Sequence, residues 1–274
     1  MYGLFKATRS KDQPMLELSY LSDFNISDEN GKMLFEALKN VGYLIQIEDL
    51  FLQVGTSLKE LKCVNSDKDT SSLYDQMKKV NRCVDQFLSS FRVYIDHTGN
   101  VLDSNSVIPG LTGDQWFKNE IKTELSRNGE FATTWCLRNY ITHSAKIIDT
   151  SLTYSNGDSI PAINKTAIIG YTDEKGNSGW KWAASSWMQG APSIINAFAL
   201  FDSAFSSLCT IHEKLVKQAL SCGMYDDVKA LVVLADLPAQ LMGVEEFYKV
   251  MFCRVTHCLR ETLNKTSDIP FSGF

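Results

Sequence analysis

An arginine and a histidine lie close together in the segment CLRNYITHS, residues 136–144. Arg138 and His143 are separated by four residues, and Asn139 directly follows the arginine. Imidazole exchanges protons near neutral pH, whereas guanidinium is a permanent cation whose N–H groups bind phosphate oxygens. These residue types therefore suit the cleavage of a phosphodiester, and RNA in particular.

RNA carries its own nucleophile, the 2′-hydroxyl beside each phosphate. Its attack needs a base for the hydroxyl proton, an acid for the leaving 5′-oxygen, and a cation that stabilises the dianionic transition state. The reaction requires no metal or cofactor, and we expect none. One histidine cannot easily fill both proton-transfer roles, so we expect a homodimer in which a second Arg138/His143 pair reaches the same cleft.

The motif can act only if its helix presents the three residues on one side. We expect a helix over residues 130–145. With a rotation of 100° per residue and Arg138 at zero, Asn139 lies at about 100° and His143 at about 140°. Trp135 falls at about 60° on the same side. The opposite side holds apolar residues that we expect to face the core, Leu137 and Ile141.

LRNYITHS resembles the motif of the HEPN superfamily, in which an arginine, often followed by Asn, Asp or His, precedes a histidine by four to six intervening residues. The resemblance implies a dimerising helical bundle with a composite cleft and, in many members, metal-independent endoribonuclease activity tied to toxin or phage-defence systems. It makes His143 the acid/base, Arg138 the clamp on the phosphate and Asn139 the orienter of the histidine. Ala145 stands where some branches have an aromatic residue, and inactive members serve as binding modules.

A second pair with the same spacing occurs in FRVYIDH, where four residues separate Arg92 from His97. Val93 replaces the polar residue behind the arginine, and Thr98-Gly99 is typical of a helix stop. We therefore interpret His97 as a residue that caps the last carbonyls of a helix. A minor alternative places it in the same cleft as an auxiliary group.

Helical periodicity dominates the chain from residue 29 onward. Apolar residues recur at three and four over residues 73–94 and again over residues 194–215, and each stretch predicts an amphipathic helix. β-branched residues around Asn156-Gly157 predict a β-hairpin with a primed turn. We predict an all-α fold, a helical bundle of about six to eight helices with one inserted β-hairpin at about residues 147–172.

Three segments are expected in the chain. Residues 1–28 form an N-terminal arm, either a short strand or an extended segment. Residues 29–223 form the HEPN-like helical bundle with the inserted hairpin, and residues 224–274 add C-terminal helices that pack on the same core.

A metal site is a weaker candidate. Cys209 and His212 are three residues apart and Cys253 and His257 are four apart, so the four side chains could converge. Structural zinc ligands, however, usually come from short loops. Because His212 lies on an apolar stripe, we interpret it as a hydrogen-bonded core histidine.

Three tryptophans, Trp180, Trp182 and Trp187, follow the predicted hairpin. Aromatic side chains stack unpaired bases in proteins that bind single-stranded RNA. Aromatic residues far more often build cores, so we interpret this cluster as an anchor between the hairpin and the bundle.

Charge limits the substrate class. The 274 residues carry a formal net charge of -5, which argues against a broad electropositive surface for long duplexes. We expect a cytoplasmic endoribonuclease toxin or defence effector that cuts single-stranded or loop RNA, with an antitoxin protein as a candidate partner and no membrane association. The alternatives are a non-catalytic α-helical dimerisation or interaction protein and an RNA-binding module without cleavage.

Overall fold

The computed structural model describes residues 5–9, 16–20, 28–66, 73–104, 113–143, 147–153, 159–172 and 175–219. The elements in this part are β1 (Phe5–Arg9), β2 (Leu16–Tyr20), α1 (Asp28–Ser66), α2 (Leu73–Ser104), α3 (Gly113–Arg127), α4 (Gly129–His143), β3 (Ile148–Thr153), β4 (Ser159–Asn164), α5 (Lys165–Ile168), α6 (Ala183–Gly190), β5 (Ile194–Asn196) and α7 (Ala197–Ala219). The predicted all-α bundle with an inserted hairpin is confirmed.

The chain divides into two compact units, and the boundary falls inside α1 after Gln46. One unit comprises residues 47–106 and 110–215, and we call it the bundle unit. In the other unit, β1 and β2 form an antiparallel hairpin from Phe5, which pairs with Tyr20, to Arg9, which pairs with Leu16. This hairpin lies within the predicted N-terminal arm. The helices predicted for residues 224–274 lie outside the described residues.

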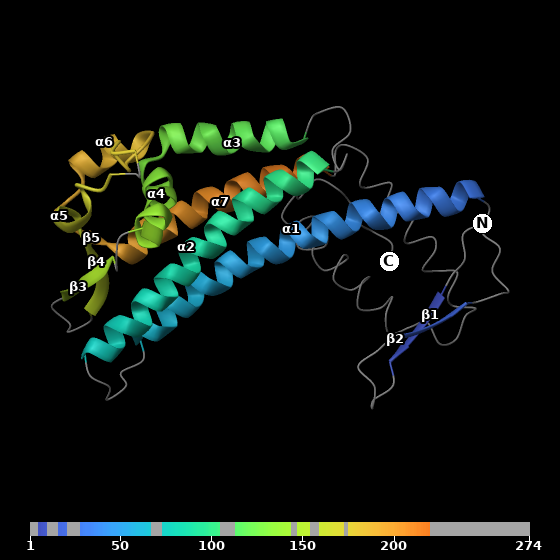
Figure 1. Ribbon diagram of the computed structural model, residues 1–274, viewed down its shortest axis with the longest axis horizontal. Coiled ribbons are helices and arrows are strands. Elements are labelled where there is room, and N and C mark those ends of the chain that lie inside the picture. The colour runs from blue at the N-terminus through green and yellow to red at the C-terminus, as the bar shows by residue number, and fades with distance from the viewer. Residues whose placement is uncertain are drawn as a thin grey trace, which may run out of the picture. The chain divides into compact units, whose positions relative to one another are not determined.

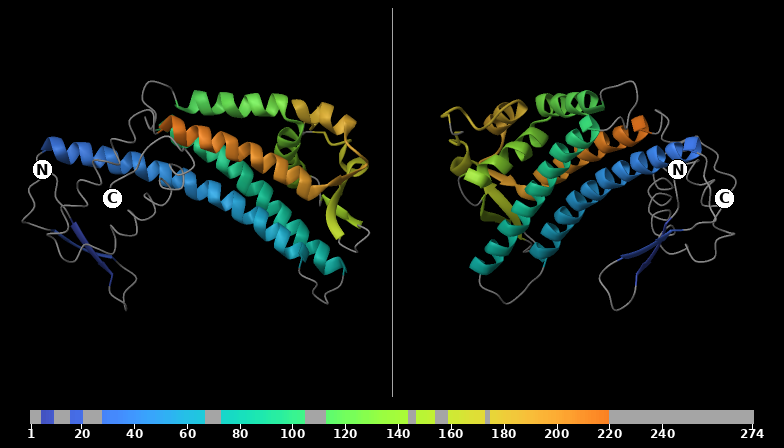
Figure 2. Two further views of the ribbon diagram at one scale, coloured as in Figure 1. Left: turned by 180° about the vertical axis from the view of Figure 1, so that it is seen from behind. Right: turned by 45° about the vertical axis from the view of Figure 1, so that its right-hand side comes forward.

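Aromatic rings fill the centre of the bundle unit. The second half of α1 runs beside α2, and α7 lies against both (Figures 1 and 2). Phe87 of α2 meets Phe201 of α7, and Phe91 of α2 meets Phe131 of α4, with ring centroids 5.0 and 5.2 Å apart. The largest rings of this core, none more than 1% exposed, are Phe87, Phe91, Tyr94, Phe117, Phe131 and Phe201. The apolar stripe predicted over residues 73–94 thus faces the core.

The predicted end of α2 near His97 is wrong, because the helix continues to Ser104. Thr98 and Leu102 are buried, with exposed fractions of 0% and 3%. A glycine inside a helix costs only about 1 kcal/mol, and burying the following turn offsets that cost at Gly99. His97 is therefore an exposed residue within the helix and does not cap its last turn.

The inserted hairpin is confirmed as β3 and β4, although the turn predicted at Asn156-Gly157 lies outside the described residues. Ile194 was expected to begin the helix predicted over residues 194–215 and instead lies in β5, which pairs antiparallel with β4 and makes a three-stranded sheet. Pairing satisfies the backbone groups on the open edge of β4, which outweighs the helical spacing of Ile194. Asn81 of α2 ties the sheet to the bundle, since its side-chain amide bonds both the N–H and the carbonyl of Ile148.

Gly129 allows α6 to approach the start of α4. A Cβ atom at this position would lie 2.4 Å from the Cβ of Trp187. Such a distance is far below normal van der Waals contact, so one of the two helices would have to move. Gly190, the last residue of α6, has nothing within 4 Å of its hypothetical Cβ.

We expect Gly129→Ala to lower the free energy of unfolding by about 1–3 kcal/mol, because the extra methyl group overfills the α4–α6 contact. Gly190→Ala adds the same methyl group in open space and should stay within about 0.5 kcal/mol of the wild type. Chemical denaturation followed by circular dichroism measures both values. Equal stability of the two variants would contradict this packing.

Candidate functional site

The first turn of α4 is tied to two other helices. Asn128 precedes the helix, and its Oδ1 accepts a hydrogen bond of 3.0 Å from the backbone N–H of Phe131. This bond satisfies one of the N–H groups that a helix start leaves without an internal partner. Asn128 Nδ2 donates to Glu124 Oε1 of α3 at 2.9 Å and to Ser207 Oγ of α7 at 2.8 Å.

Glu124 is the charged centre of this junction and is only 5% exposed. Its Oε2 accepts hydrogen bonds from Arg127, at 2.7 Å from Nε and 2.6 Å from Nη2. Burial raises the pKa of the Glu124 carboxyl, but hydrogen bonds from Asn128, Arg127 and Ser207, together with the charge of Arg127, outweigh it and the pKa lies below its usual value. The ionised carboxylate therefore stabilises the start of α4.

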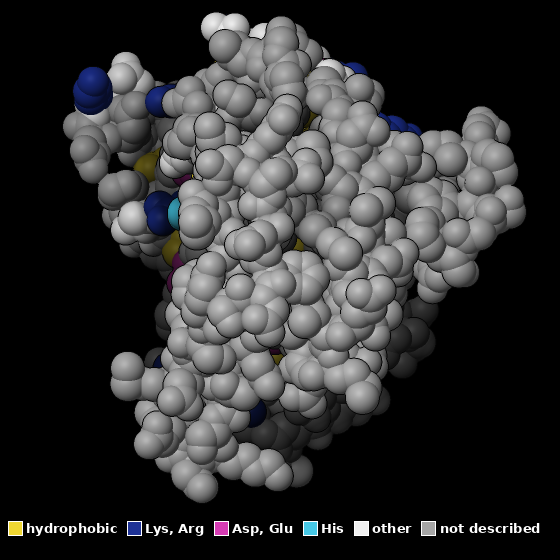
Figure 3. All heavy atoms as spheres, turned by 90° about the vertical axis from the view of Figure 1, so that its right-hand side faces the viewer, with side chains coloured by type: hydrophobic (Ala, Val, Ile, Leu, Met, Phe, Trp, Pro, Cys, Tyr) yellow, Lys and Arg dark blue, Asp and Glu magenta, His cyan; other side chains and the backbone are white. Residues whose placement is uncertain are grey.

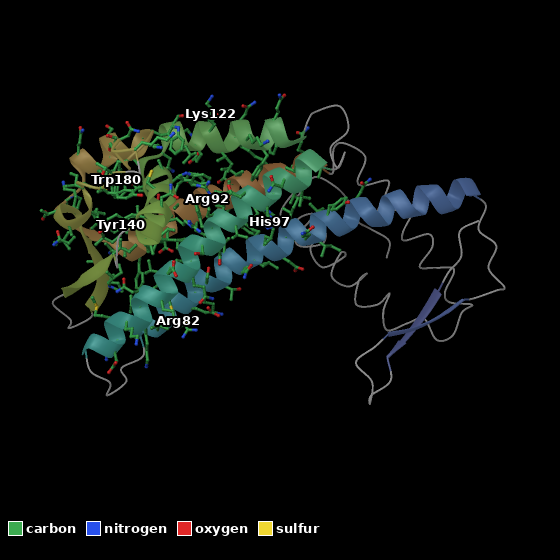
Figure 4. All side chains as sticks on the ribbon, viewed as in Figure 1. Arg82, Arg92, His97, Lys122, Tyr140 and Trp180 are labelled. Atoms are coloured by element: carbon green, nitrogen blue, oxygen red, sulfur yellow. The ribbon has the colours of Figure 1, made fainter. Side chains whose placement is uncertain are left out.

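One side of α4 is buried, as the sequence predicts. Leu137 is fully buried, whereas Ile141 is only half-buried. Tyr140 is 8% exposed, and its ring meets Tyr171 edge to face with centroids 5.3 Å apart. Tyr140 and Trp180 lie on the same side of the bundle unit (Figure 4). The opposite side of α4 is accessible only in its second half, where Asn139 and Thr142 are exposed, since Phe131 and Ala132 of the first half are fully buried.

The polar residues of the motif lie on that accessible side. Arg138 is half-buried and Asn139 is exposed. Arg138 Nη1 donates a hydrogen bond of 2.8 Å to Thr142 Oγ1, which in turn donates to the carbonyl of Arg138 at 2.9 Å. His143 is the last residue of α4 and lies one turn beyond Asn139. Its side chain is not among those that the structure describes. The guanidinium thus extends along the helix toward the turn that carries His143.

The second arginine–histidine pair has a different environment. Arg92 Nε bonds Asp96 Oδ2 at 2.7 Å, and the guanidinium carbon lies 3.6 Å from the ring centroid of Trp135. Asp96 compensates the charge of Arg92, whereas among the described residues the acceptor of Arg138 is the neutral Thr142 hydroxyl.

Arg92 and His97 both lie on α2 (Figure 4). Among the histidines whose side chains are described, His97 is exposed and His212 is buried. Figure 3 shows a histidine ring at the surface next to a lysine or arginine side chain. The bond to Asp96 and the contact with Trp135 explain the position of Arg92 without His97.

Two of the three tryptophans contact α5 and α4, and the predicted anchor between the hairpin and the bundle stays a prediction. Trp180 is 5% exposed, and its Nε1 donates to the carbonyl of Ile168 at 3.1 Å. Trp187 packs on Gly129.

Trp182 differs from these two, because it is 46% exposed and has a φ of 52° and a ψ of -140°. Its ring meets Trp135 of α4 edge to face, with centroids 6.5 Å apart. Trp135 was not among the predicted site residues, although its helical angle beside Arg138 already pointed to this side.

The predicted core histidine is confirmed. His212 Nδ1 lies 3.0 Å from the Tyr94 hydroxyl, its Nε2 lies 2.7 Å from Glu48 Oε2, and Phe51 stacks on the ring at 3.9 Å. Both ring nitrogens are therefore engaged. Burial, followed by the charge of Glu48, raises the pKa of the Tyr94 hydroxyl. No substrate reaches this group, because Tyr94 has an exposed fraction of 0%.

The described residues include no group of three or more His, Cys, Asp or Glu side chains arranged to hold a metal ion. Cys253 and His257, the other half of the metal-site alternative, lie outside them. In the same ranges, no helix is both long and apolar enough to span a membrane.

No family model, curated protein or solved structure matches this chain. The candidate site therefore rests on the residues and contacts of α4 and its neighbours.

Acid should weaken the α4 junction through Glu124. A group whose pKa is lowered by folding contributes stability above its unfolded-state pKa, and this contribution is lost as the pH falls through the folded-state value. We expect Glu124→Gln to be less stable than the wild type at pH 7, with a gap that narrows as the pH falls from 7 to below the usual carboxyl value of 4.5. Urea unfolding across this pH range measures the gap, and a constant difference would contradict the ionised junction.

The backbone of Trp182 predicts an unusual order of stabilities. A φ of 52° is unfavourable for any residue with a Cβ atom and acceptable for glycine. We expect Trp182→Gly to be more stable than Trp182→Ala by about 1 kcal/mol, because both lose the ring but only glycine relieves the backbone. Thermal unfolding of the two variants tests this order, and a more stable alanine variant would refute it.

Proposed function

We propose that this protein is a metal-independent endoribonuclease that works as a homodimer, with Arg138, Asn139 and His143 as its catalytic residues. The observation that carries the proposal is the division of α4 into a buried side and an accessible side that holds Arg138 and Asn139. A substrate or a second copy of the chain can reach these residues without any rearrangement of the core. Arg92 is a poorer candidate for binding phosphate, because the carboxylate of Asp96 already pairs with its guanidinium.

The reaction needs two proton transfers. The His143 imidazole of one copy takes the proton of the 2′-hydroxyl, and the 2′-oxygen forms a bond to the adjacent phosphorus. The bond from phosphorus to the 5′-oxygen breaks, and the second copy's His143 gives a proton to that oxygen. The products are a 2′,3′-cyclic phosphate and a free 5′-hydroxyl.

Arg138 and Asn139 assist the two histidines. The Arg138 guanidinium donates hydrogen bonds to the phosphate oxygens as they gain charge in the transition state. To do so it exchanges the Thr142 hydroxyl for the phosphate, which replaces a neutral acceptor by a charged one. Asn139, one turn before His143, orients the imidazole.

The acidic character of the chain limits the choice of RNA. A net charge of -5 leaves only local clusters of cations for phosphate contacts, and a single-stranded segment or a loop needs few of them. A tRNA anticodon loop is such a substrate. Cleavage there halts growth, which fits a cytoplasmic toxin or phage-defence effector that a partner antitoxin holds in check.

The main alternative is an α-helical dimerisation or interaction protein without catalysis. The hydrogen bond from Arg138 to Thr142 favours this alternative, since a guanidinium bonded within its own helix is also common on surfaces without a catalytic role. An RNA-binding module without cleavage is the other alternative.

We expect purified wild type to cleave single-stranded or tRNA substrates with chelator present, and His143→Ala to slow cleavage by about 10²- to 10⁴-fold through loss of the proton transfer. Arg138→Ala should lose activity similarly, and Arg138→Lys should regain part of it, because lysine keeps the charge without the fork. Gel electrophoresis measures cleavage, and 2′,3′-cyclic phosphate ends identify the reaction.

His97→Ala and Arg82→Ala are matched controls, because each removes an exposed side chain of the same type from α2. Both should cleave as fast as the wild type. Cleavage that persists unchanged in His143→Ala, or a wild type that cuts no RNA, would leave only the binding alternatives.

A further inference from the structure

Two indole rings lie beside the motif on α4, the half-buried Trp135 and the exposed Trp182. Trp135 meets Trp182 edge to face, and the Arg92 guanidinium lies 3.6 Å from the centroid of the Trp135 ring. Lys181 precedes Trp182 and is exposed. We call these four residues the tryptophan platform.

The platform does not behave as a core cluster. Trp182 remains 46% exposed, so its ring gains only part of the free energy that burial of an indole provides. Its backbone nevertheless adopts a φ of 52°, which is strained for a bulky residue. Such strain gathers at binding and catalytic sites, where the position of a side chain matters more than its stability.

Two members of the platform are cations. Burial raises the pKa of the Cys136 thiol on α4, while a backbone hydrogen bond from Lys181 and the charges of Lys181 and Arg92 oppose this rise. Both cations therefore act on the same part of the helix. Asp96 compensates the Arg92 charge, so phosphate contacts fall to Lys181 and to Arg138, which lies three residues beyond Trp135 on α4.

The platform is continuous with the motif. Trp135 precedes Arg138 by three residues, a spacing that brings side chains on a helix within about 5–6 Å at their Cβ atoms. Around the helix axis, Trp135 lies between Arg138 and Asn139. A nucleotide whose base contacts the indoles can therefore place its phosphate at the Arg138 guanidinium.

We propose that the tryptophan platform is a base-stacking subsite for single-stranded RNA, in which an unpaired base stacks on Trp182 and the neighbouring phosphates contact the cations around it. Indole faces bind any base, whereas the bases of a duplex are already stacked inside it. This subsite rests on the proposed function only for its role in placing the scissile phosphate. Binding by itself needs no cleavage.

A 2′-O-methyl RNA decamer tests the subsite directly, because it lacks the attacking hydroxyl and cannot be cut. We expect the decamer to bind wild type more tightly than its abasic counterpart of the same charge or the corresponding duplex. Trp182→Gly should weaken binding of the decamer at least about fivefold, and Trp182→Phe should retain most of the affinity. Fluorescence anisotropy of a labelled decamer measures these affinities.

Leu52→Ala is the matched control, since Leu52 is another exposed apolar side chain at 52% and lies on α1. It should bind the decamer as the wild type does. Equal affinity of Trp182→Gly and wild type, or no preference for the decamer over its abasic counterpart, overturns the subsite. Dissociation of a dimer by Trp182→Gly with unchanged RNA affinity assigns the platform to a protein contact and also overturns it.

The two proposals fail in different ways. If Arg138→Ala loses cleavage but Trp182→Gly binds the decamer as the wild type does, the stacking subsite is wrong and the nuclease proposal is supported. If the wild type cuts no RNA but binds the decamer through Trp182, the nuclease proposal is wrong and the subsite is supported. If both hold, Trp182→Gly raises KM for a cleavable RNA more than it lowers kcat.

Discussion

The buried carboxylate of Glu124 is the contact on which the geometry of α4 depends. It joins the end of α3 to Asn128, the residue that caps α4, and Asn128 in turn reaches α7. A buried charge is stable only when hydrogen bonds compensate it, and Arg127 and Asn128 supply them here. The start of α4 therefore has little freedom to rotate, and this decides which side of the helix faces outward.

Similar side chains have opposite roles in this fold because of their surroundings. Trp180 is buried with its N–H satisfied, whereas Trp182, two residues later, is exposed on a strained backbone. His212 is enclosed by Glu48, Tyr94 and Phe51, although its two hydrogen bonds look like those of a catalytic histidine. A catalytic side chain must be accessible to its substrate, and the residues on the outer side of α4 are accessible whereas His212 is buried.

The proposed nuclease site and the proposed stacking subsite use the same physical device, one helix with an inner and an outer side. The inner side is buried, and the outer side carries both the charge of Arg138 and the half-buried indole of Trp135, which Arg92 and Trp182 contact. An acidic protein can bind a polyanion in this way, because a few cations at one place suffice for a short segment of RNA.

Features that depend on local spacing could be predicted from the amino-acid sequence. The apolar stripe of α2, the inserted hairpin and the burial of Leu137 opposite Arg138 all follow from helical or strand periodicity, which neighbouring residues encode. Asn139 and Arg138 fall on one side of α4 for the same reason. The role of His143 and the dimer remain predictions that rest on the motif.

Features that depend on distant residues could not be predicted in this way. The helix α2 continues beyond Gly99 because the turn after it is buried. Ile194 lies in a strand because it pairs with the edge of β4 that would otherwise be unpaired. The meeting of Trp135 with Trp182 joins residues far apart in the chain, and no local pattern encodes it. Periodicity is a property of neighbours along the chain, whereas burial and pairing are settled by whichever segments the fold brings together.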